Sequence, residues 1–130
     1  MIVIDSSILC AIFFNEPERT AFQLILNSED RRLLSAVNAH ETATVLRGKL
    51  GRKAVADFWR WLGENGVEVA PFDEFQARAA AAAFDRYGKG INSKARLNLA
   101  DCAAYALAKT TNAPLLFKGD DFAHTDVGRR

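Results

Sequence analysis

Short runs of hydrophobic residues alternate along this chain with longer stretches in which hydrophobic residues recur at helical spacing. The short runs predict four strands, at residues 1–5, 33–35, 67–71 and 115–118. The longer stretches predict helices, at residues 8–14, 17–26, 36 to 48 or 51, 53–63, 73–87 and 99–111. Residues 88–93 contain the longest run of helix-breaking residues and are expected to form a loop.

This order of elements predicts an α/β fold with three layers, α/β/α. Parallel strands need helical crossovers, and a sheet built from them is covered by helices on both faces, which suits strands that are apolar throughout. We expect a central, mostly parallel sheet of about four or five strands. A chain of 130 residues is long enough to bury one core, so residues 1–130 are expected to form a single domain.

Acidic residues stand at the junctions between the predicted elements. Asp5 directly follows the first strand, and Asp120 and Asp121 follow the last one. Glu41 lies within the helix predicted from residue 36, and Asp101 lies in the first turn of the helix predicted from residue 99. Ligands of parallel α/β sheets bind outside the carboxyl ends of the strands, and we expect these carboxylates to converge there.

Four converging carboxylates favour a divalent cation. Two carboxylates about 4 Å apart repel each other by roughly 4 kcal/mol at an effective dielectric constant of about 20, so such a cluster needs protons or a cation. Mg²⁺ and Mn²⁺ prefer oxygen ligands and take one or two carboxylates directly, while further carboxylates hold their waters. Such an ion can polarise a phosphoryl oxygen and lower the pKa of an attacking water, which suits hydrolysis of a phosphodiester.

Each acid also has a purely structural interpretation. Asp5 can cap the helix that follows it, and Asp101 stands three residues after an asparagine, where a capping box would place it. Glu41 can be a solvated helix position, and Asp120 with Asp121 can form a turn. Against these interpretations, Asp101 interrupts a run of leucine and alanine residues, an unusually apolar setting for a cap. Taken together, the acids favour a functional site.

Composition excludes several classes of protein. Hydrophobic residues make up 49% and charged residues 25% of the chain, as in ordinary globular proteins. No apolar run reaches the roughly 20 residues that span a bilayer, and no basic leader opens the chain, so we expect a cytoplasmic protein without membrane contact. Cys10 and Cys102 have apolar neighbours and are expected to be structural thiols. Zinc-ligand spacing, a phosphate-binding glycine loop and a Gly-x-Ser-x-Gly elbow are all absent from the sequence.

The distribution of charge says more about partners than the net charge of +1 does. Without the four proposed site acids, 17 basic residues face 12 acidic ones, a surplus of five on the rest of the molecule. Basic residues gather at positions 47–53 and 86–96, and the candidate phosphate contacts are Arg47, Lys49, Arg86, Lys89, Lys94 and Arg96. The alternative is that they are solvated helix ends and loops.

The chain resembles the PIN-domain ribonucleases and, more narrowly, the VapC-type toxins of bacterial type II toxin-antitoxin pairs. The stretches that carry the resemblance are residues 2–7 (IVIDSS), the helix around Glu41, residues 95–108 (ARLNLADCAAYALA) and residues 115–122 (LLFKGDDF). It covers essentially the whole chain, and residues 95–108 and 119–127 are its most specific parts.

The resemblance implies an endoribonuclease that depends on Mg²⁺, with Mn²⁺ able to substitute, and that cleaves RNA with water activated by the metal. By position, Asp5, Glu41 and Asp101 match the metal-site acids of the family. Asp121 is favoured as the fourth acid because the family carboxylate directly precedes a phenylalanine, and Asp120 is the substitute.

The resemblance also implies supporting residues and partners. Ser6, Thr125 and Asp126 match supporting positions near the site. The family implies a homodimer and a VapB-type antitoxin whose tail enters the active-site groove. From the residues themselves, Trp59 and Trp61 are two apart on a helix and cannot both face inward easily, so a homodimer or antitoxin interface near them or near the early helices is expected.

Two other functions compete with the metal-dependent ribonuclease. A phosphatase of the haloacid-dehalogenase kind would need an aspartate at position 7, which is Ser7. A catalytically inactive PIN-like module that only binds RNA or protein would be favoured by loss of an acid, and all of them are present. The loop at residues 89–94 is less basic than in close relatives of the family. His40 next to Glu41 points elsewhere on the helix, which favours a structural role for it.

Overall fold

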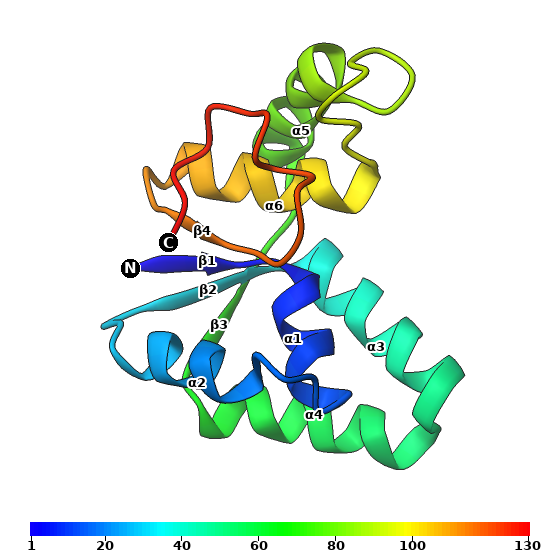
Figure 1. The fold of residues 1–130 in the computed structure, drawn as a ribbon, viewed down its shortest axis with the longest axis vertical. Helices are drawn as coiled ribbons and strands as arrows, with labels where there is room; N and C mark the ends of the chain where they lie inside the picture. The colour runs from blue at the N-terminus through cyan, green and yellow to red at the C-terminus, as the bar shows by residue number, and fades with distance from the viewer.

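Four short parallel strands form the centre of the computed structural model, which describes residues 1–130 (Figure 1). In chain order the elements are β1 (Ile2–Ile4), α1 (Ser6–Phe13), α2 (Arg19–Asn27), β2 (Arg32–Ser35), α3 (Ala36–Leu50), α4 (Arg52–Glu64), β3 (Val67–Ala70), α5 (Glu74–Tyr87), α6 (Leu99–Thr110) and β4 (Leu115–Leu116). The strand order is β3-β2-β1-β4, and every neighbouring pair is parallel. The predicted α/β class and parallel sheet are confirmed.

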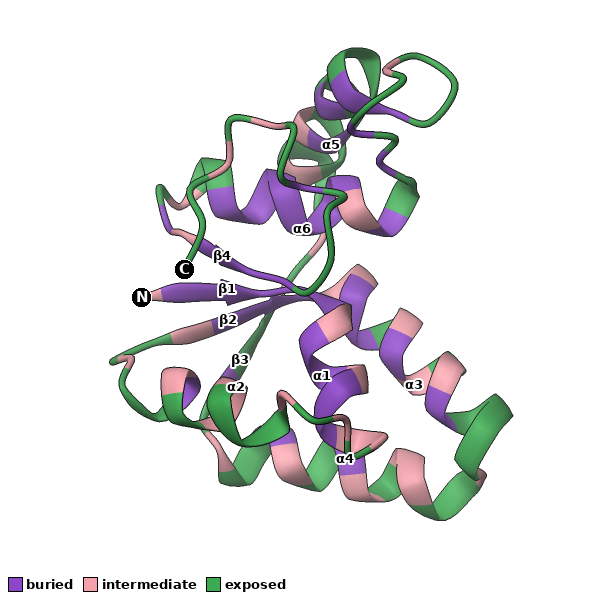
Figure 2. Ribbon diagram, viewed as in Figure 1, coloured by how far each residue is buried: buried purple, intermediate pink, exposed green.

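Helices cover both faces of this sheet, as predicted. Helices α5 and α6 lie on one face, and α1 to α4 lie on the other (Figure 1). Successive residues of a strand point to opposite faces, and β1 shows this clearly. Val3 packs in the apolar cluster that includes α5 and α6, whereas Ile2 and Ile4 pack in the cluster formed with α1 to α4. All three side chains are completely buried (Figure 2).

Strand β1 occupies an inner position in the sheet, and this places the residue after it. Val3 pairs with Leu33 of β2 on one side and with Leu115 of β4 on the other. Because all strands run the same way, the segments that leave β1, β2 and β4 emerge at one edge of the sheet. Asp5 stands in the middle of that carboxyl edge.

Several predicted helix ends are also observed. Asp5, Ser35 and Asn98 each accept a hydrogen bond from a backbone N–H in the first turn of the helix that follows. Helix α3 ends at Leu50 and is followed by Gly51, which has φ +89°, a conformation that side-chain-bearing residues rarely adopt, and α4 begins at the next residue. Strands β1, β3 and β4 are shorter than predicted, most clearly β4, which pairs over only two residues, whereas β2 begins one residue earlier than predicted.

The aromatic residues of the early helices are largely used inside the fold. Phe13 packs edge-on against Phe58 and Trp61, with ring centroids 5.7 and 5.9 Å apart. Trp61 is half-buried in this cluster, while Trp59 is 46% exposed, so the two tryptophans do face different ways. The most exposed large apolar side chains are Leu99 on α6, Phe75 on α5 and Leu24 on α2.

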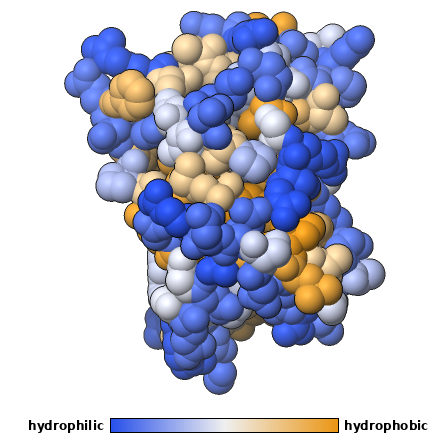
Figure 3. All heavy atoms as spheres, turned by 90° about the vertical axis from the view of Figure 1, so that its left-hand side faces the viewer, coloured by the Kyte–Doolittle hydropathy of each residue, from blue (hydrophilic) through white to orange (hydrophobic).

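The face of the molecule that carries both chain ends is mainly polar. Hydrophilic residues predominate on it, and hydrophobic ones are scattered (Figure 3). None of the helices combines the length and the apolar character that crossing a membrane requires.

Candidate active site

Asp5 is fixed at the start of α1. Its Oδ2 atom accepts a hydrogen bond of 3.1 Å from the backbone N–H of Ser7, and only 6% of the residue is exposed. Burial raises the pKa of its carboxyl group, the hydrogen bonds from Ser7 oppose this effect, and the negative charge of Glu41 adds to it. A buried carboxylate in this position is costly unless positive charge compensates it.

Asp101 combines the structural and the functional interpretation in one side chain. It closes a capping box at the start of α6, in which its backbone N–H donates to Asn98 Oδ1 at 2.8 Å and its Oδ2 accepts from the Asn98 N–H at 3.0 Å. Its carboxyl pKa is nevertheless raised from 3.8 to about 7, mainly by burial and further by the negative charges of Asp5, Asp121 and Glu41. The capping hydrogen bonds therefore hold the Asp101 carboxylate near three other negatively charged groups.

The four predicted metal-site acids thus come within electrostatic range of one another from four separate parts of the chain. Asp5 follows β1, Glu41 is half-buried on α3, Asp101 lies on α6, and Asp121 is exposed in the segment after β4. Their side chains do not form a compact cluster. No group of three or more His, Cys, Asp or Glu side chains is close enough to hold a metal ion as it stands. Mutual repulsion of uncompensated carboxylates favours such spacing.

Two of these acids, Asp101 and Asp121, line a polar cavity of about 400 Å³, and Asp5 and Glu41 are not among its lining residues. The residues that line it are Lys89, Lys94, Arg96, Asn98, Asp101, Asp120, Asp121 and His124. Acidic and basic groups therefore share one pocket, as expected for a site that binds both a cation and a polyanion. Asp120 and Asp121 both line it, and the charge of Asp121 is one of the causes of the raised Asp101 pKa.

Three of the six candidate phosphate contacts lie at this pocket, and three do not. Arg86 stacks over the ring of Tyr87 and lies 3.6 Å from the carboxylate of Asp126. Arg47 lines a different pocket, of about 330 Å³, between α3 and α4. Lys49 lies 5.7 Å from the ring centroid of Phe14. Only Lys89, Lys94 and Arg96 stand beside the acids.

The predicted supporting residues make structural contacts. Asp126 accepts hydrogen bonds from the Tyr105 hydroxyl and from Lys109 Nζ, which ties the segment after β4 to α6. Thr125 Oγ1 donates to the Phe122 carbonyl at 2.7 Å within a turn. Ser6 is buried and bonded to α3, while Asp5 is contacted by the next serine.

Sequence reasoning missed three residues near the acids. Ser7 donates its N–H to Asp5, and its Oγ accepts from the Lys118 N–H at 3.0 Å, which links α1 to the end of β4. His124 lines the acid pocket, whereas His40 is exposed on α3. Asn38 is completely buried beside Ser6. The serine doublet after Asp5 was a usable signal for Ser7, but no local pattern distinguishes the other two.

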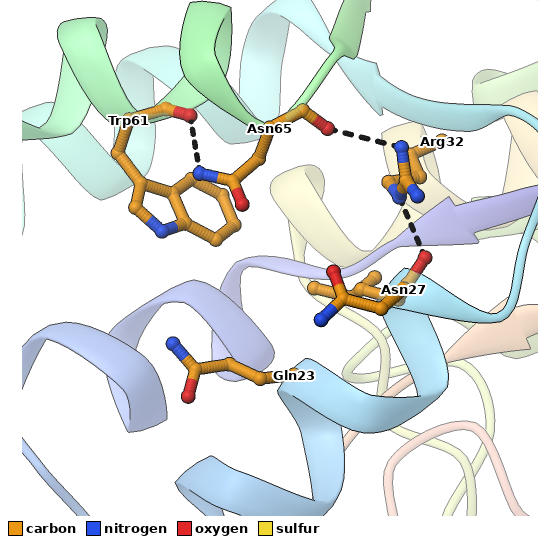
Figure 4. Close-up of a pocket in the computed structure, with 6 residues that line it drawn as sticks. Gln23, Asn27, Arg32, Trp61 and Asn65 are labelled. Atoms are coloured by element: carbon orange, nitrogen blue, oxygen red, sulfur yellow. Dashed lines mark hydrogen bonds between the residues drawn. The ribbon is translucent and has the colours of Figure 1, made fainter.

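A second polar pocket lies at the opposite edge of the sheet, between α2, β2 and α4 (Figure 4). Arg32 begins β2, so it marks the amino edge. Its Nε donates to the Leu26 carbonyl at 2.6 Å and its Nη1 to the Asn65 carbonyl at 3.1 Å. These carbonyls belong to the carboxyl ends of α2 and α4, where a cation is favourable. The pocket is explained by this packing role.

The donor chemistry of the acid site fits a divalent cation. The four acids offer only carboxylate oxygens, which Mg²⁺ and Mn²⁺ prefer. Burial, and then the like charges of Asp5, Asp121 and Glu41, raise the pKa of Asp101, as expected for a desolvated carboxylate near other carboxylates. A cation would offset these negative charges.

The fold and the site can be compared with known proteins. A sequence profile of the PIN domain matches residues 2–128. The chain therefore belongs to the PIN-domain family, as its sequence motifs suggested.

Two ribonucleases of the VapC type are similar to this chain over nearly its whole length. The chain is 40% identical over 125 residues to ribonuclease VapC30 of Mycobacterium tuberculosis, an alignment that covers 96% of this chain and 95% of the relative. It is also 40% identical over 125 residues to ribonuclease VapC of Mycolicibacterium smegmatis, covering 96% of each.

Solved structures share the fold at lower sequence identity. The Mycobacterium tuberculosis toxin VapC20, which cleaves the sarcin-ricin loop, matches with a TM-score of 0.82 at 15% identity over 100% of this chain and 98% of the other. VapBC2 from Rickettsia felis bound to a promoter DNA fragment matches with a TM-score of 0.73 at 14% identity, over 99% and 96% of the two chains.

Proposed function

We propose that this protein is a VapC-type ribonuclease, the toxin component of a toxin-antitoxin pair, and that residues 1–130 act as one PIN domain in the cytoplasm. Ribonuclease activity is supported by membership of the family and by relatives of that name aligned over nearly the whole chain. The observation that carries the site is the environment of Asp101, whose carboxyl pKa is raised by burial and by the charges of Asp5, Asp121 and Glu41.

We further propose that the cofactor is Mg²⁺, with Mn²⁺ able to substitute. Asp5 and Asp101 would hold the cation directly, while Glu41 and Asp121 would hold its waters or a second ion. A bound divalent cation supplies positive charge to a phosphodiester and makes water a stronger nucleophile. Asp5 and Asp101 are suited to direct contact because each is fixed by a backbone hydrogen bond at a helix start, which limits the rotamers to be ordered on binding.

The basic side of the pocket is assigned to the substrate. Lys89, Lys94 and Arg96 line the same cavity as Asp101 and Asp121. Their positive charges would contact phosphates on either side of the bond to be cleaved and hold the RNA backbone against the negative floor of the site. Sequence selectivity would then come from unpaired bases of a single-stranded or loop region.

Cleavage of RNA by matched variants tests this function. Purified protein is incubated with total bacterial RNA in Mg²⁺ or in Mn²⁺, with EDTA, and as the Asp5→Asn and Asp101→Asn variants, and the cleavage ends are mapped. Asp85→Asn is the control, because Asp85 is exposed on α5 and its side chain makes no hydrogen bond or ion pair. We expect discrete cuts that disappear with EDTA and in both site variants and persist in the control.

The alternative of an inactive binding module makes the opposite prediction. Such a module would bind RNA or protein and cleave nothing in any divalent cation. Cuts that survive in Asp5→Asn and Asp101→Asn would place the catalytic centre elsewhere, and binding without cleavage of any RNA would favour the module.

We propose a VapB-type antitoxin as the protein partner, and a homodimer as the assembly. The structures of similar fold include a toxin-antitoxin complex from Klebsiella pneumoniae and VapBC2 from Rickettsia felis. Beside the acid pocket lies an apolar cavity of about 500 Å³, lined among others by Phe84, Leu99 and Cys102. An antitoxin tail that reaches the site would find basic and apolar contacts close together. Light scattering of the purified chain tests the dimer, and inhibition of cleavage by a purified antitoxin tests the partner.

A further inference from the structure

Asn38 is a polar side chain that the proposed mechanism does not use, and it is completely buried among three helices. It lies in the first turn of α3. Its Nδ2 donates one hydrogen bond of 3.1 Å to Ser6 Oγ on α1 and another of 3.1 Å to the carbonyl of Ala100 on α6. One amide group therefore joins segments that are 32 and 62 residues away in sequence.

The partners of Asn38 are the immediate neighbours of two site acids. Ser6 follows Asp5, and Ala100 precedes Asp101. The Ser6 hydroxyl also donates to the Asn38 carbonyl at 3.4 Å, so α1 and α3 are joined by a reciprocal pair of bonds. The amide thus links the segments from which Asp5 and Asp101 project.

The orientation of this amide follows from its partners. The Ala100 carbonyl can only accept a hydrogen bond, so the amide NH₂ group must face it. The Asn38 Oδ1 atom is then left buried without a hydrogen-bond partner. An unpaired buried acceptor destabilises a fold by an amount comparable to what such donated bonds contribute, so net stability is a poor explanation for an asparagine at this position.

The two hydrogen bonds of Asn38 Nδ2 oppose an electrostatic repulsion between the starts of α1 and α6. Asp5 caps the start of α1 and Asp101 lies in the first turn of α6, and two ionised carboxylates at these helix starts repel each other. Their repulsion drives the start of α1 away from the start of α6. The two bonds of Asn38 Nδ2 oppose that movement because they hold both helix starts to α3.

We propose that Asn38 is a positioning residue, which holds the helix starts that carry Asp5 and Asp101 at the separation needed for both to bind one divalent cation. This inference rests on the proposed function. Groups that orient metal ligands without touching the metal typically change its affinity 10-fold to 100-fold when they are removed.

The test measures Mn²⁺ affinity and metal-free stability in the same variants. Asn38→Leu removes both bonds and the unpaired acceptor while keeping a side chain of similar size. Ser6→Ala removes one of the bonds and a single oxygen atom, and it serves if the first variant does not fold. Thr42→Val is the matched control, because Thr42 is equally buried on α3 and its hydroxyl bonds only to the Asn38 carbonyl, within the helix.

Mn²⁺ affinity is measured by isothermal titration calorimetry and stability by urea unfolding in EDTA. We expect the Mn²⁺ dissociation constant to rise about 10-fold in Asn38→Leu and about 3-fold in Ser6→Ala, with no change in Thr42→Val. The metal-free unfolding midpoint of Asn38→Leu should stay close to that of the wild type.

These outcomes distinguish failure of the positioning role from failure of the proposed function. If folded Asn38→Leu and Ser6→Ala bind Mn²⁺ as tightly as the wild type, or if Thr42→Val weakens binding equally, Asn38 has only a packing role and the inference is wrong. If the wild-type protein itself does not bind Mn²⁺, the proposed cofactor fails and the positioning role fails with it.

Discussion

Asp101 is expected to destabilise the metal-free protein at neutral and alkaline pH. Its carboxyl pKa in the folded protein is raised from 3.8 to about 7, chiefly by burial. Between these two values the folded protein keeps a proton that the unfolded chain has lost. The penalty is therefore nearly absent below about pH 4, grows as the pH rises, and is complete above about pH 7. Asp101→Asn removes the charge but keeps an oxygen that can accept from the Asn98 N–H.

The size of this effect can be worked out from the raised pKa. A rise from 3.8 to about 7 corresponds to about 4 kcal/mol, at about 1.4 kcal/mol per pH unit. Solvent screens part of this energy because the carboxylate is partly exposed, and a negative charge at the start of α6 gives back about 0.5 kcal/mol. We expect Asp101→Asn to raise the free energy of unfolding by about 2 kcal/mol at pH 8 and by less than about 1 kcal/mol at pH 5.

Urea unfolding in EDTA at the two pH values measures this difference. Asp85→Asn provides the control, since the same substitution at an exposed helix position should change the free energy of unfolding little at either pH. A gain of the same size at pH 5 and pH 8, or no gain at pH 8, would refute the reasoning that Asp101 is held in a negatively charged, desolvated place.

Three further predictions concern cation binding, the contacts of Asp126 in the segment after β4, and RNA binding. Saturating Mn²⁺ should raise the melting temperature of the wild-type protein, by the equivalent of about 2.7 kcal/mol at a hundred times Kd. Asp5→Asn should abolish this rise in melting temperature. An equal rise in both proteins, measured by scanning fluorimetry, would remove Asp5 from the metal site. Asp126→Asn should lose about 1 kcal/mol of stability at pH 7, because its carboxylate accepts from Tyr105. That hydrogen bond lowers the Asp126 pKa, so the contribution is present at neutral pH and is lost as the pH falls through the lowered value; a loss independent of pH in urea unfolding would contradict it. Lys94→Ala should weaken RNA binding and reduce its salt dependence by about one phosphate contact. Arg86→Ala should change neither, since Arg86 pairs with Asp126. Equal losses of RNA affinity in the two variants, measured by fluorescence anisotropy, would contradict this placement.

The sequence was most informative where chemistry follows directly from order along the chain. Asp5 had to lie at the carboxyl edge once residues 1–5 were a buried strand, because a parallel sheet leaves no other place for the next residue. The cap formed by Asn98 and Asp101 also depends only on local spacing. The apolar strands and the helical spacing between them were enough to predict the three layers.

The sequence was least informative where a role depends on distant partners. Arg86 and Lys94 look alike in the sequence, but only the fold shows that Arg86 faces Asp126 and that Lys94 lines the acid pocket. Asp126 was predicted from the resemblance to support the site, and its observed contacts are with Tyr105 and Lys109. Asn38 gave no signal, because a polar residue in a first helical turn is usually solvated.

The hydrogen bonds from Arg32 to the ends of α2 and α4 make the two edges of the sheet respond differently to salt and pH. Its partners are neutral carbonyl groups rather than carboxylates, so neither added salt nor a change of pH around neutrality weakens this contact much. At the opposite edge, the interactions among carboxylates change with every proton or cation that is bound. Changes in buffer should therefore act more strongly at the carboxyl edge than on this contact, and hydrogen exchange should vary more with solution conditions near Asp5 than at the carboxyl ends of α2 and α4.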